Sequence, residues 1–346
     1  ILVRSVALLA LCIASLPHGG GLLAQDDEFV ELDKGGPLRI AVSPRHGGEL
    51  TSMKYRFEGA WHELIYRARE YDVAEGWSGK APLLWPAVGI TLDPGSAGRG
   101  FRHDGRLYPM PPHGFARDRE WAVVDRGTDG DADFVTLSLA SDADTRRHYP
   151  FDFELRVTYH LFGERLAIEY TVTAGSKNAG PMPFSIGNHI TFKAPLIEGG
   201  DPAAVRFRNA FPDQLIRGED RAFSGRVVSS PFRDEQPLSR LPRRQAVSLG
   251  GGEGLAELTV LDPSGLTVQM RHWASSEPAP PVIRFNLWAD TEEGFFSPEP
   301  WLGTQNSLGS GLGLIRLDPG QSWNWHIEIE PSVSDIPEFI DNEESK

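Results

Sequence analysis

Three short stretches of the sequence join a side chain that can transfer a proton to proline, glycine or aromatic neighbours. They are Pro111-Pro112-His113-Gly114-Phe115, Gly187-Asn188-His189-Ile190-Thr191-Phe192 and Ser297-Pro298-Glu299-Pro300-Trp301. Such neighbours are typical of loops that present side chains over a rigid sheet. A histidine near a turn can also be a structural hydrogen-bond donor, and a glutamate between prolines can be a solvated loop residue. His113, His189 and Glu299 are therefore candidates for acid–base chemistry.

The chemistry that these side chains favour is proton transfer between an acid and a base. Reference pKa values of about 4.3 for Glu and about 6.5 for His suit an ionised base and a protonatable acid near neutral pH. The sequence holds no Gly-x-Ser-x-Gly elbow, which argues against acyl transfer by a serine triad. The glycine run 309–313 is not a GxGxxG fingerprint, and we interpret it as a flexible loop between strands.

The elements that position these residues are predicted to be β-strands. Odd positions of residues 151–161 are apolar, and after Phe162-Gly163-Glu164 the even positions of 166–172 are apolar, which predicts a long hairpin. A second hairpin is predicted to join 258–260 to 266–270, and a third to pair 314–317 with 323–329. Residues 195–250 lack periodicity and are interpreted as long loops. The pattern predicts an all-β fold, a large antiparallel β-sandwich.

Composition and charge restrict the possible partners of the protein. The chain has 346 residues, of which 37 are Gly and 27 are Pro, and this excess indicates many turns between short elements. Its single cysteine, Cys12, excludes an intramolecular disulfide and a CxxC motif. A formal net charge of −14 argues against nucleic acid and anionic membranes as partners. The oligomeric state cannot be predicted from these features.

The first residues have the pattern of an export signal. Arg4 precedes the apolar run 6–16, which is shorter than the roughly 20 residues that span a bilayer, and Ala24 precedes a polar, acidic segment. A buried hydrophobic helix is the alternative. We expect a signal peptide over 1–24, a single sandwich domain over 25–334, an acidic flexible tail over 335–346, and a periplasmic or secreted protein.

The three stretches, in this order, resemble the aldose 1-epimerase (galactose mutarotase) family. Its members carry a His-Gly-Phe-type motif, a later Asn-His-x-x-Phe motif and a Glu-Pro-Trp motif near the C-terminus. Gly47-Gly48-Glu49-Leu50, Ala81-Pro82-Leu83-Leu84-Trp85-Pro86 and Leu317-Asp318-Pro319-Gly320 agree as well. The resemblance extends over roughly residues 35 to 331 and implies the mutarotase-like fold, two large antiparallel sheets packed as one extended sandwich.

The resemblance implies an enzyme that interconverts the α and β anomers of a free sugar. Opening the hemiacetal requires a base that takes the proton of the anomeric hydroxyl and an acid that protonates the ring oxygen. By resemblance, Glu299 is this base, His189 is this acid, and His113 binds and polarises the sugar near C1. The substrate is then a small carbohydrate, and neither a metal nor another cofactor is implied.

Three further residues are substrate-binding candidates, each with a structural alternative. Arg117 is expected to bind sugar hydroxyls or orient Glu299, or else to form an ion pair with Asp118 or Glu120. Trp301 is expected to stack on a sugar face or to lie in the core. Asn188 is expected to contact substrate or simply to cap the loop that holds His189.

The sequence also departs from the family. Galactose mutarotases carry an Asn-Arg pair that contacts sugar hydroxyls, and residues 84–89 offer neither, which indicates a divergent branch. Asp213 and Asp290 are both candidates for the family's substrate-binding aspartate. Two rival functions remain: a hexose-6-phosphate 1-epimerase, which the export signal disfavours, and a non-catalytic carbohydrate-binding protein on the same fold.

Overall fold

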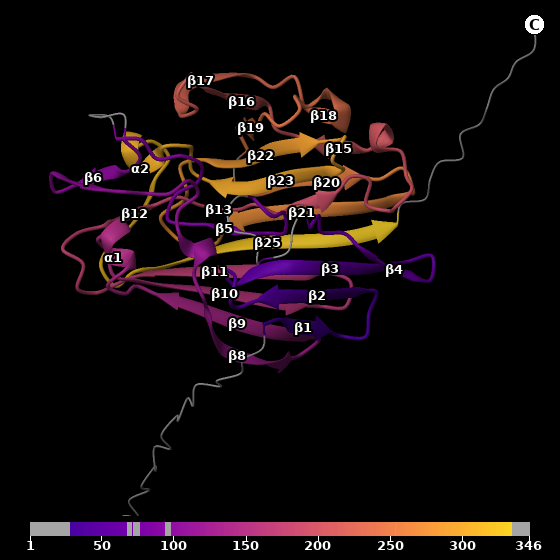
Figure 1. The fold of residues 1–346 in the computed structure, drawn as a ribbon, viewed down its shortest axis with the longest axis horizontal. Helices are drawn as coiled ribbons and strands as arrows, with labels where there is room; N and C mark the ends of the chain where they lie inside the picture. Colours follow the sequence, from indigo (N-terminus) through magenta and orange to yellow (C-terminus); the bar gives the residue numbers. More distant parts are fainter. Residues whose placement is uncertain (1–27, 68–70, 72–76, 94–97, 253, 334–346) are drawn as a thin grey trace, which may run out of the picture.

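The computed structural model describes residues 28–67, 71, 77–93, 98–252 and 254–333 of the chain (Figure 1). The predicted signal peptide and the predicted acidic tail lie outside these residues. In the described part, no helix is long and apolar enough to cross a membrane.

A nine-stranded antiparallel sheet is the largest element of the fold. Its strand order is β18-β15-β20-β21-β25-β11-β10-β9-β8. The bounds are β8 (Ala122–Asp129), β9 (Ala132–Ala140), β10 (Phe153–Leu161), β11 (Leu166–Ala174), β15 (Arg206–Asn209), β18 (Asp234–Pro237), β20 (Ala256–Leu261), β21 (Leu266–Ala274) and β25 (Ser322–Val333).

A second large sheet has the order β17-β16-β19-β22-β23-β13-β5, with β14 also paired to β23. Its bounds are β5 (Leu83–Leu84), β13 (Ile186–Asn188), β14 (Phe192–Lys193), β16 (Asp213–Arg217), β17 (Phe223–Ser229), β19 (Val247–Gly250), β22 (Ile283–Asp290) and β23 (Phe295–Leu302).

Smaller elements complete the structure. A four-stranded sheet runs in chain order, and two ribbons pair β6 with β7 and β12 with β24. The bounds are β1 (Val30–Asp33), β2 (Leu38–Ser43), β3 (Glu49–Phe57), β4 (Ala60–Glu63), β6 (Phe101–His103), β7 (Arg106–Tyr108), β12 (Met182–Phe184), β24 (Ile315–Leu317), α1 (Thr145–His148) and α2 (Ser307–Ser310), with 3₁₀ turns at Ala116–Asp118, Pro202–Ala204 and Leu238–Arg240.

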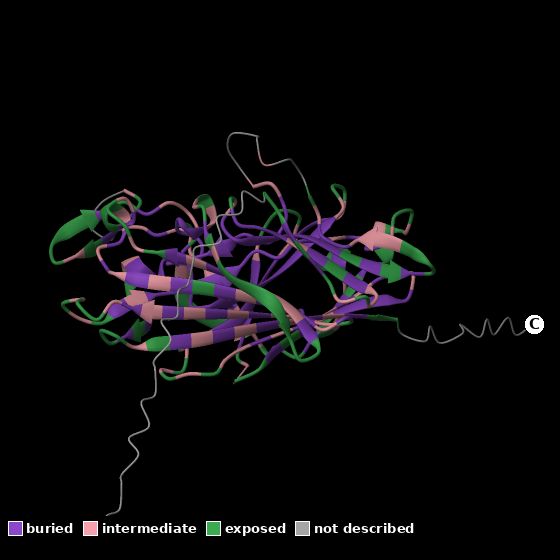
Figure 2. Cartoon of the chain, turned by 90° about the horizontal axis from the view of Figure 1, so that it is seen from below, coloured by how far each residue is buried: buried purple, intermediate pink, exposed green. Residues whose placement is uncertain are grey.

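The sheets pack in two layers around an apolar core. The four-stranded sheet contacts β9 and β10, whereas β22 of the second large sheet contacts β20, so the two sheets cover different parts of the nine-stranded sheet (Figure 1). Buried and more exposed residues alternate along the outer strands (Figure 2). The described chain is therefore an all-β antiparallel sandwich, as the sequence predicts.

Two of the three predicted hairpins are confirmed in their positions, and the first is also confirmed in its buried faces. Strands β10 and β11 pair with Phe153 opposite Ala174 and Leu161 opposite Leu166. Their buried positions are odd in β10 and even in β11, because side chains alternate between the two faces of a strand. Strands β20 and β21 form the second hairpin.

The third predicted hairpin is wrong. Strand β24 pairs with β12, and β25 lies between β21 and β11 in the nine-stranded sheet. Since both edges of β25 are occupied by these longer strands, β24 cannot pair with it. The turn at Asp318–Gln321 closes as expected, with Gln321 N donating to Asp318 O at 2.9 Å, but it leads the chain from a short ribbon into a central strand.

The interpretation of residues 195–250 as long loops is also wrong in part. This segment contributes β15 and β18 to the nine-stranded sheet and β16, β17 and β19 to the second. Most positions of β16, β17 and β18 are only half-buried or exposed, so they lack the clean apolar alternation of a strand with one face in the core. The glycine run 309–313 likewise begins in the short helix α2.

Candidate active site

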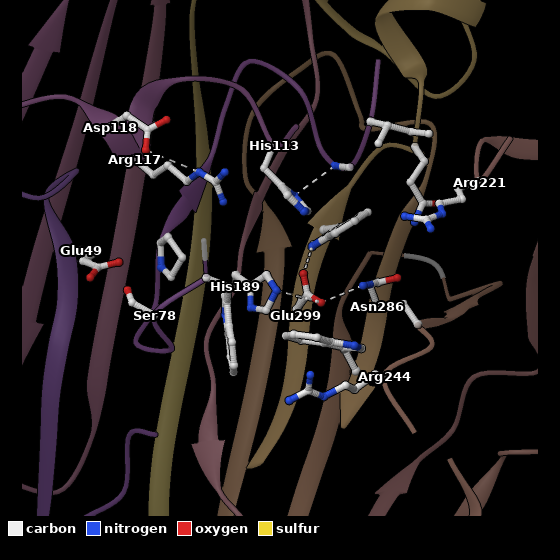
Figure 3. A pocket seen from close by; sticks show the side chains of 18 of the residues that line it. Glu49, Ser78, His113, Arg117, Asp118, His189, Arg221, Arg244, Asn286 and Glu299 are labelled. Carbon is white, nitrogen blue, oxygen red and sulfur yellow. Dashed lines mark hydrogen bonds and ion pairs between the residues drawn. The ribbon is translucent and has the colours of Figure 1, made fainter. Parts of the chain in front are cut away.

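A cavity of about 760 Å³ opens over the surface of the second large sheet. His113, His189 and Glu299 all line it, although they come from segments far apart in the chain, and Figure 3 shows their side chains converging. The volume lies within the range of about 300–1,000 Å³ that small-molecule sites occupy. The structure therefore brings together the three side chains that the sequence singles out for proton transfer.

Strand register places His189 directly opposite Glu299. Strands β13 and β14 both pair with β23, the first through Ile186 and Leu302, the second through Phe192 and Phe296. His189 is midway in sequence between Ile186 and Phe192. Glu299 is midway between their partners, Leu302 and Phe296. On the far edge of β23, Asn286 of β22 pairs with Glu299. Three polar side chains thus form one row across the sheet.

The prolines on either side of Glu299 fit the same register. Residues 189–191 form no strand between β13 and β14, so β23 has no strand partner there for residues 297–300. Pro298 and Pro300 face Leu287 and Phe285 of β22, and proline is tolerated where a ladder is interrupted. Glu299 therefore lies in a buried strand and not in the loop that the sequence suggests. His189 lies in the short non-strand segment between β13 and β14, and His113 lies in a loop.

The carboxylate of Glu299 is held by two neutral donors. Asn286 Nδ2 donates to Oε1 at 2.8 Å, and Trp301 Nε1 donates to Oε2 at 3.0 Å. The amide of Asn286 is itself fixed, because its oxygen accepts from Arg217 Nη2 at 2.7 Å and from Ser248 Oγ at 3.1 Å. Donors to both oxygens favour the ionised carboxylate and fix its orientation toward the cavity.

Burial dominates the electrostatics of the pair. His189 Nε2 lies 3.7 Å from Glu299 Oε1, and both residues are almost fully buried. Loss of hydration raises the pKa of Glu299 to about 8, although Asn286, Arg217, Trp301 and Arg284 all oppose the rise. Burial lowers the pKa of His189 to about 3. Burial thus favours an uncharged pair that holds one proton at neutral pH.

The loop that carries His113 is locked to the sheet by its backbone. His113 N donates to Gly89 O at 2.7 Å, and Gly89 N donates to His113 Nδ1 at 3.2 Å, so the neutral ring carries its proton on Nε2. Gly114 follows with φ +72°, and a Cβ there would lie 2.0 Å from the carbonyl oxygen of Trp85. Only glycine fits this approach. His113 itself has φ +67°, a strained value that clusters at functional sites.

Aromatic rings form walls around the row. The ring of His113 lies 6.0 Å from that of His189 and 5.8 Å from that of Trp301. Trp77 and Trp288 flank His189 at 5.8 and 5.5 Å between ring centroids. Burial, and then the neighbouring His189, lower the pKa of His113 well below its usual range. His113 is therefore neutral at pH 7 and can donate a hydrogen bond from Nε2.

The substrate-binding candidates divide into two groups. Arg117 lines the cavity, donates to Pro112 O at 3.2 Å and lies 3.8 Å from Asp118, so the ion pair considered as its alternative role is present at the cavity wall. Trp301 lines the cavity and holds Glu299. Asn188 does not line it, because its side chain is fully buried and donates to Tyr170 Oη at 2.8 Å. Its expected contact with substrate is therefore not supported.

Neither candidate aspartate reaches the cavity wall. Asp290 is buried against Arg243 and Arg244, at 3.0 and 2.7 Å, and Asp213 lies at the start of β16. Neither is among the residues that line the cavity. No group of three or more potential metal ligands converges in the described part of the chain.

Several cavity residues escaped the sequence analysis. Glu49, noted only as part of a motif, lines the far end of the cavity, where burial raises its pKa to about 8 and Tyr71 donates to it. Asn286 and Arg217 were not singled out. The signal for Asn286 was present: Arg284 and Asn286 alternate with apolar residues in a strand that is buried at every position but Trp288, and buried polar side chains require partners.

Comparisons with known proteins agree with the fold. The family model described as aldose 1-epimerase matches residues 29–202. Protein LacX of Lactococcus lactis subsp. lactis is 27% identical over 282 residues, covering 77% of this chain and 85% of LacX. The crystal structure of the Slr1438 protein from Synechocystis is 25% identical, with a TM-score of 0.71 over 88% of this chain and 96% of that one. A galactose mutarotase-like protein from Lactobacillus casei has a TM-score of 0.69 at 24% identity, over 88% and 100% of the two chains.

Proposed function

Since the chain belongs to the aldose 1-epimerase family, we propose that it is an active mutarotase that interconverts the anomers of a free sugar. The observation that carries the proposal is the facing pair at the cavity wall, His189 Nε2 at 3.7 Å from Glu299 Oε1. A carbohydrate-binding protein without turnover has no need of an acid and a base that face each other in one concave site.

The reaction divides between the two side chains. Glu299 takes the proton of the anomeric hydroxyl while His189 gives a proton to the ring oxygen, and the bond between the anomeric carbon and the ring oxygen breaks. The open-chain carbonyl rotates about its bond to the next carbon. Reclosure on the other face returns a proton from Glu299 to the carbonyl oxygen and takes one back to His189. Each such transfer typically contributes about 10²–10⁴-fold to the rate.

This cycle agrees with the number of protons that His189 and Glu299 hold together. Ring opening moves one proton onto the pair through Glu299 and one proton off it through His189, so the pair holds one proton before and after the step. The uncharged pair that burial favours is the state that follows opening. The charged pair that precedes opening is stabilised by the donors Asn286 and Trp301 and by the nearby cation of Arg217.

Four other cavity residues are placed to bind and orient the sugar, namely His113, Trp288, Trp301 and Arg117. The Nε2 proton of His113 is free of its backbone contacts and is available to a sugar hydroxyl near the anomeric carbon. The indole rings of Trp288 and Trp301 offer apolar faces to the carbon skeleton of a sugar. Arg117 supplies donors on the His189 side of the cavity.

Polarimetry tests the proposal directly. The purified protein should accelerate the relaxation of a freshly dissolved α-aldose toward its anomeric equilibrium, after subtraction of the rate in buffer. The panel should include neutral aldoses, sugar acids and hexose 6-phosphates. No acceleration over buffer with any of these sugars would refute the enzyme reading and favour simple binding.

A further inference from the structure

Two arginines lie together beside Asn286, at one end of the row that this residue forms with Glu299 and His189. Arg217, the last residue of β16, donates to Asn286, which in turn donates to Glu299. Gln305 faces the same guanidinium, and with its amide oxygen turned inward it accepts from Arg217 Nε at 2.9 Å. Arg221 follows in the turn between β16 and β17, and its charge disfavours that of Arg217, which burial already penalises. Both arginines line the cavity.

Arg221 is held in this place at a conformational cost. It has φ +66°, and the turn is closed by Arg221 N donating to Gly218 O at 3.0 Å and by Gly218 N donating to Ala222 O at 2.9 Å. A non-glycine residue in this region costs roughly 1–2 kcal/mol and persists where the surroundings impose it. The strained turn places a second guanidinium beside the first.

The charge of Arg221 is not neutralised by the described protein. Its guanidinium has no hydrogen bond or ion pair with any residue that the structure describes, whereas Arg244, across the cavity, is paired with Asp290 and Glu293. Two adjacent guanidinium groups repel each other, and an anion bound between them would relieve that repulsion and accept several charge-assisted hydrogen bonds. The chain as a whole has a formal net charge of −14, so this local excess of positive charge is opposite in sign to the overall charge.

The position of Arg217 and Arg221 relative to His189 and Glu299 limits where on a substrate a negative charge could lie. This step rests on the proposed function, in which Glu299 contacts the anomeric hydroxyl and His189 contacts the ring oxygen. Figure 3 shows His189 on one side of Glu299, and Asn286 and Arg221 on the other. The arginines therefore lie near the anomeric carbon, on the side away from the ring oxygen. In an aldohexopyranose, C5 and its exocyclic substituent C6 lie beyond the ring oxygen, on the opposite side.

We propose that the substrate is a 2-keto sugar acid, with its carboxylate bonded to the anomeric carbon and bound by Arg217 and Arg221. A carboxylate so close to Glu299 would otherwise oppose ionisation of the base, because like charges disfavour one another. The two guanidinium groups offset this repulsion, and a bidentate arginine contact orients the carboxylate plane. Uronates and hexose 6-phosphates share the anionic chemistry but carry the charge at C5 or C6.

The test compares four sugars with two variants of the full chain. N-acetylneuraminate carries its carboxylate on the anomeric carbon, glucuronate at C5 and glucose 6-phosphate at C6, and glucose is neutral. Anomer exchange is measured by NMR for the wild type, Arg221→Gln and the control Arg226→Gln. Arg226 is an exposed arginine of β17 that does not line the cavity. Thermal unfolding of each variant checks its folding.

We expect kcat/KM to be highest for N-acetylneuraminate. Arg221→Gln should lower that value about 10–100-fold, the loss expected for a hydrogen bond to a charged group, and should change the value for glucose less than about threefold. Arg226→Gln should change neither. A preference for glucuronate or glucose 6-phosphate would overturn the placement at the anomeric carbon. An equal loss with glucose would overturn the anion site.

Calorimetric binding separates this inference from the proposed function. If no sugar is turned over, the proposed function fails, but N-acetylneuraminate should still bind the wild type and bind Arg221→Gln about 10–100-fold more weakly. Equal binding to both proteins would overturn the inference regardless of turnover.

Discussion

His189 lies opposite Glu299 in the antiparallel register of β13, β14 and β23, and their nearest polar atoms, Nε2 and Oε1, are 3.7 Å apart. The strands on either side of His189 set this distance together with the backbone of His189, whose N donates to Pro82 O at 2.9 Å. Rigid strands that flank a residue hold its side chain more precisely than a long loop does. The pair is therefore the part of the site on which the first predictions depend.

Glu299→Gln should lower kcat about 10²–10⁴-fold, because the amide keeps the size of the side chain but cannot accept the proton of the anomeric hydroxyl. Polarimetric relaxation of a substrate sugar measures the loss. Glu257→Gln, at an exposed position of β20, is the matched control and should retain wild-type activity. A Glu299→Gln protein as active as the control would remove Glu299 from the mechanism.

The pH profile should be flat through neutral pH and fall on the alkaline side. The pKa of Glu299 is raised to about 8 and that of His189 is lowered to about 3, so the pair holds its single proton between these values. Above about pH 8 the pair loses this proton, and kcat/KM should fall about tenfold per unit. The profile is measured against buffer blanks. A decline centred near pH 6.5, the ordinary pKa of histidine, would contradict this prediction.

Asn286→Ala should act through Glu299. Removing the amide donor removes a hydrogen bond that favours the ionised carboxylate, so the pKa of Glu299 should rise further, and the alkaline limb of the profile should move to higher pH. We expect kcat to fall at least about tenfold, the scale of a lost hydrogen bond to a charged group. Asn324→Ala, in β25 of the other sheet, is the control. A variant that loses stability while its pH profile stays in place would show a purely structural role.

Gly114→Ala should unfold at a markedly lower temperature than the wild type and lose activity. The new methyl group would meet the Trp85 carbonyl oxygen at 2.0 Å in a backbone with φ +72°, so the loop that carries His113 must move. Gly130→Ala is the matched control, since Gly130 has φ +58° but nothing within 4 Å of its Cβ position. The control isolates the conformational cost, roughly 1–2 kcal/mol. Equal Tm values for the two variants would argue against the steric clash.

Local patterns predicted those parts of the fold whose partners are close in sequence. The hairpin of β10 and β11 was predictable because its two alternating segments are separated by a short turn. The partner of β24 was not, because β12 is distant in sequence and the tight turn at Asp318 suggested a simpler pairing. In the segment 195–250, the half-buried strands show little apolar periodicity. They are defined by their pairing with neighbouring strands, which the local pattern cannot reveal.

The same limit applies to the site. Residue types and their neighbours pointed to His113, His189 and Glu299, all of which line the cavity. They could not reveal that Glu299 lies within a strand, since prolines on both sides ordinarily argue for a loop. Asn286 and Arg217 enter the site only through strand register, which depends on pairings between distant segments. Asn188 was misplaced because adjacent residues of an extended chain point in opposite directions.

The segment between β13 and β14, which carries His189, bears on the order in which the chain folds. The row that holds the proton-transfer pair exists only when this segment docks on β23, a contact such as that of Thr191 with Ser297 across 106 residues of sequence. Hairpins such as β10–β11 and β20–β21 close over far shorter loops, and contacts of long sequence separation form slowly. A refolding chain should therefore recover much of its strand content before any of its catalytic power.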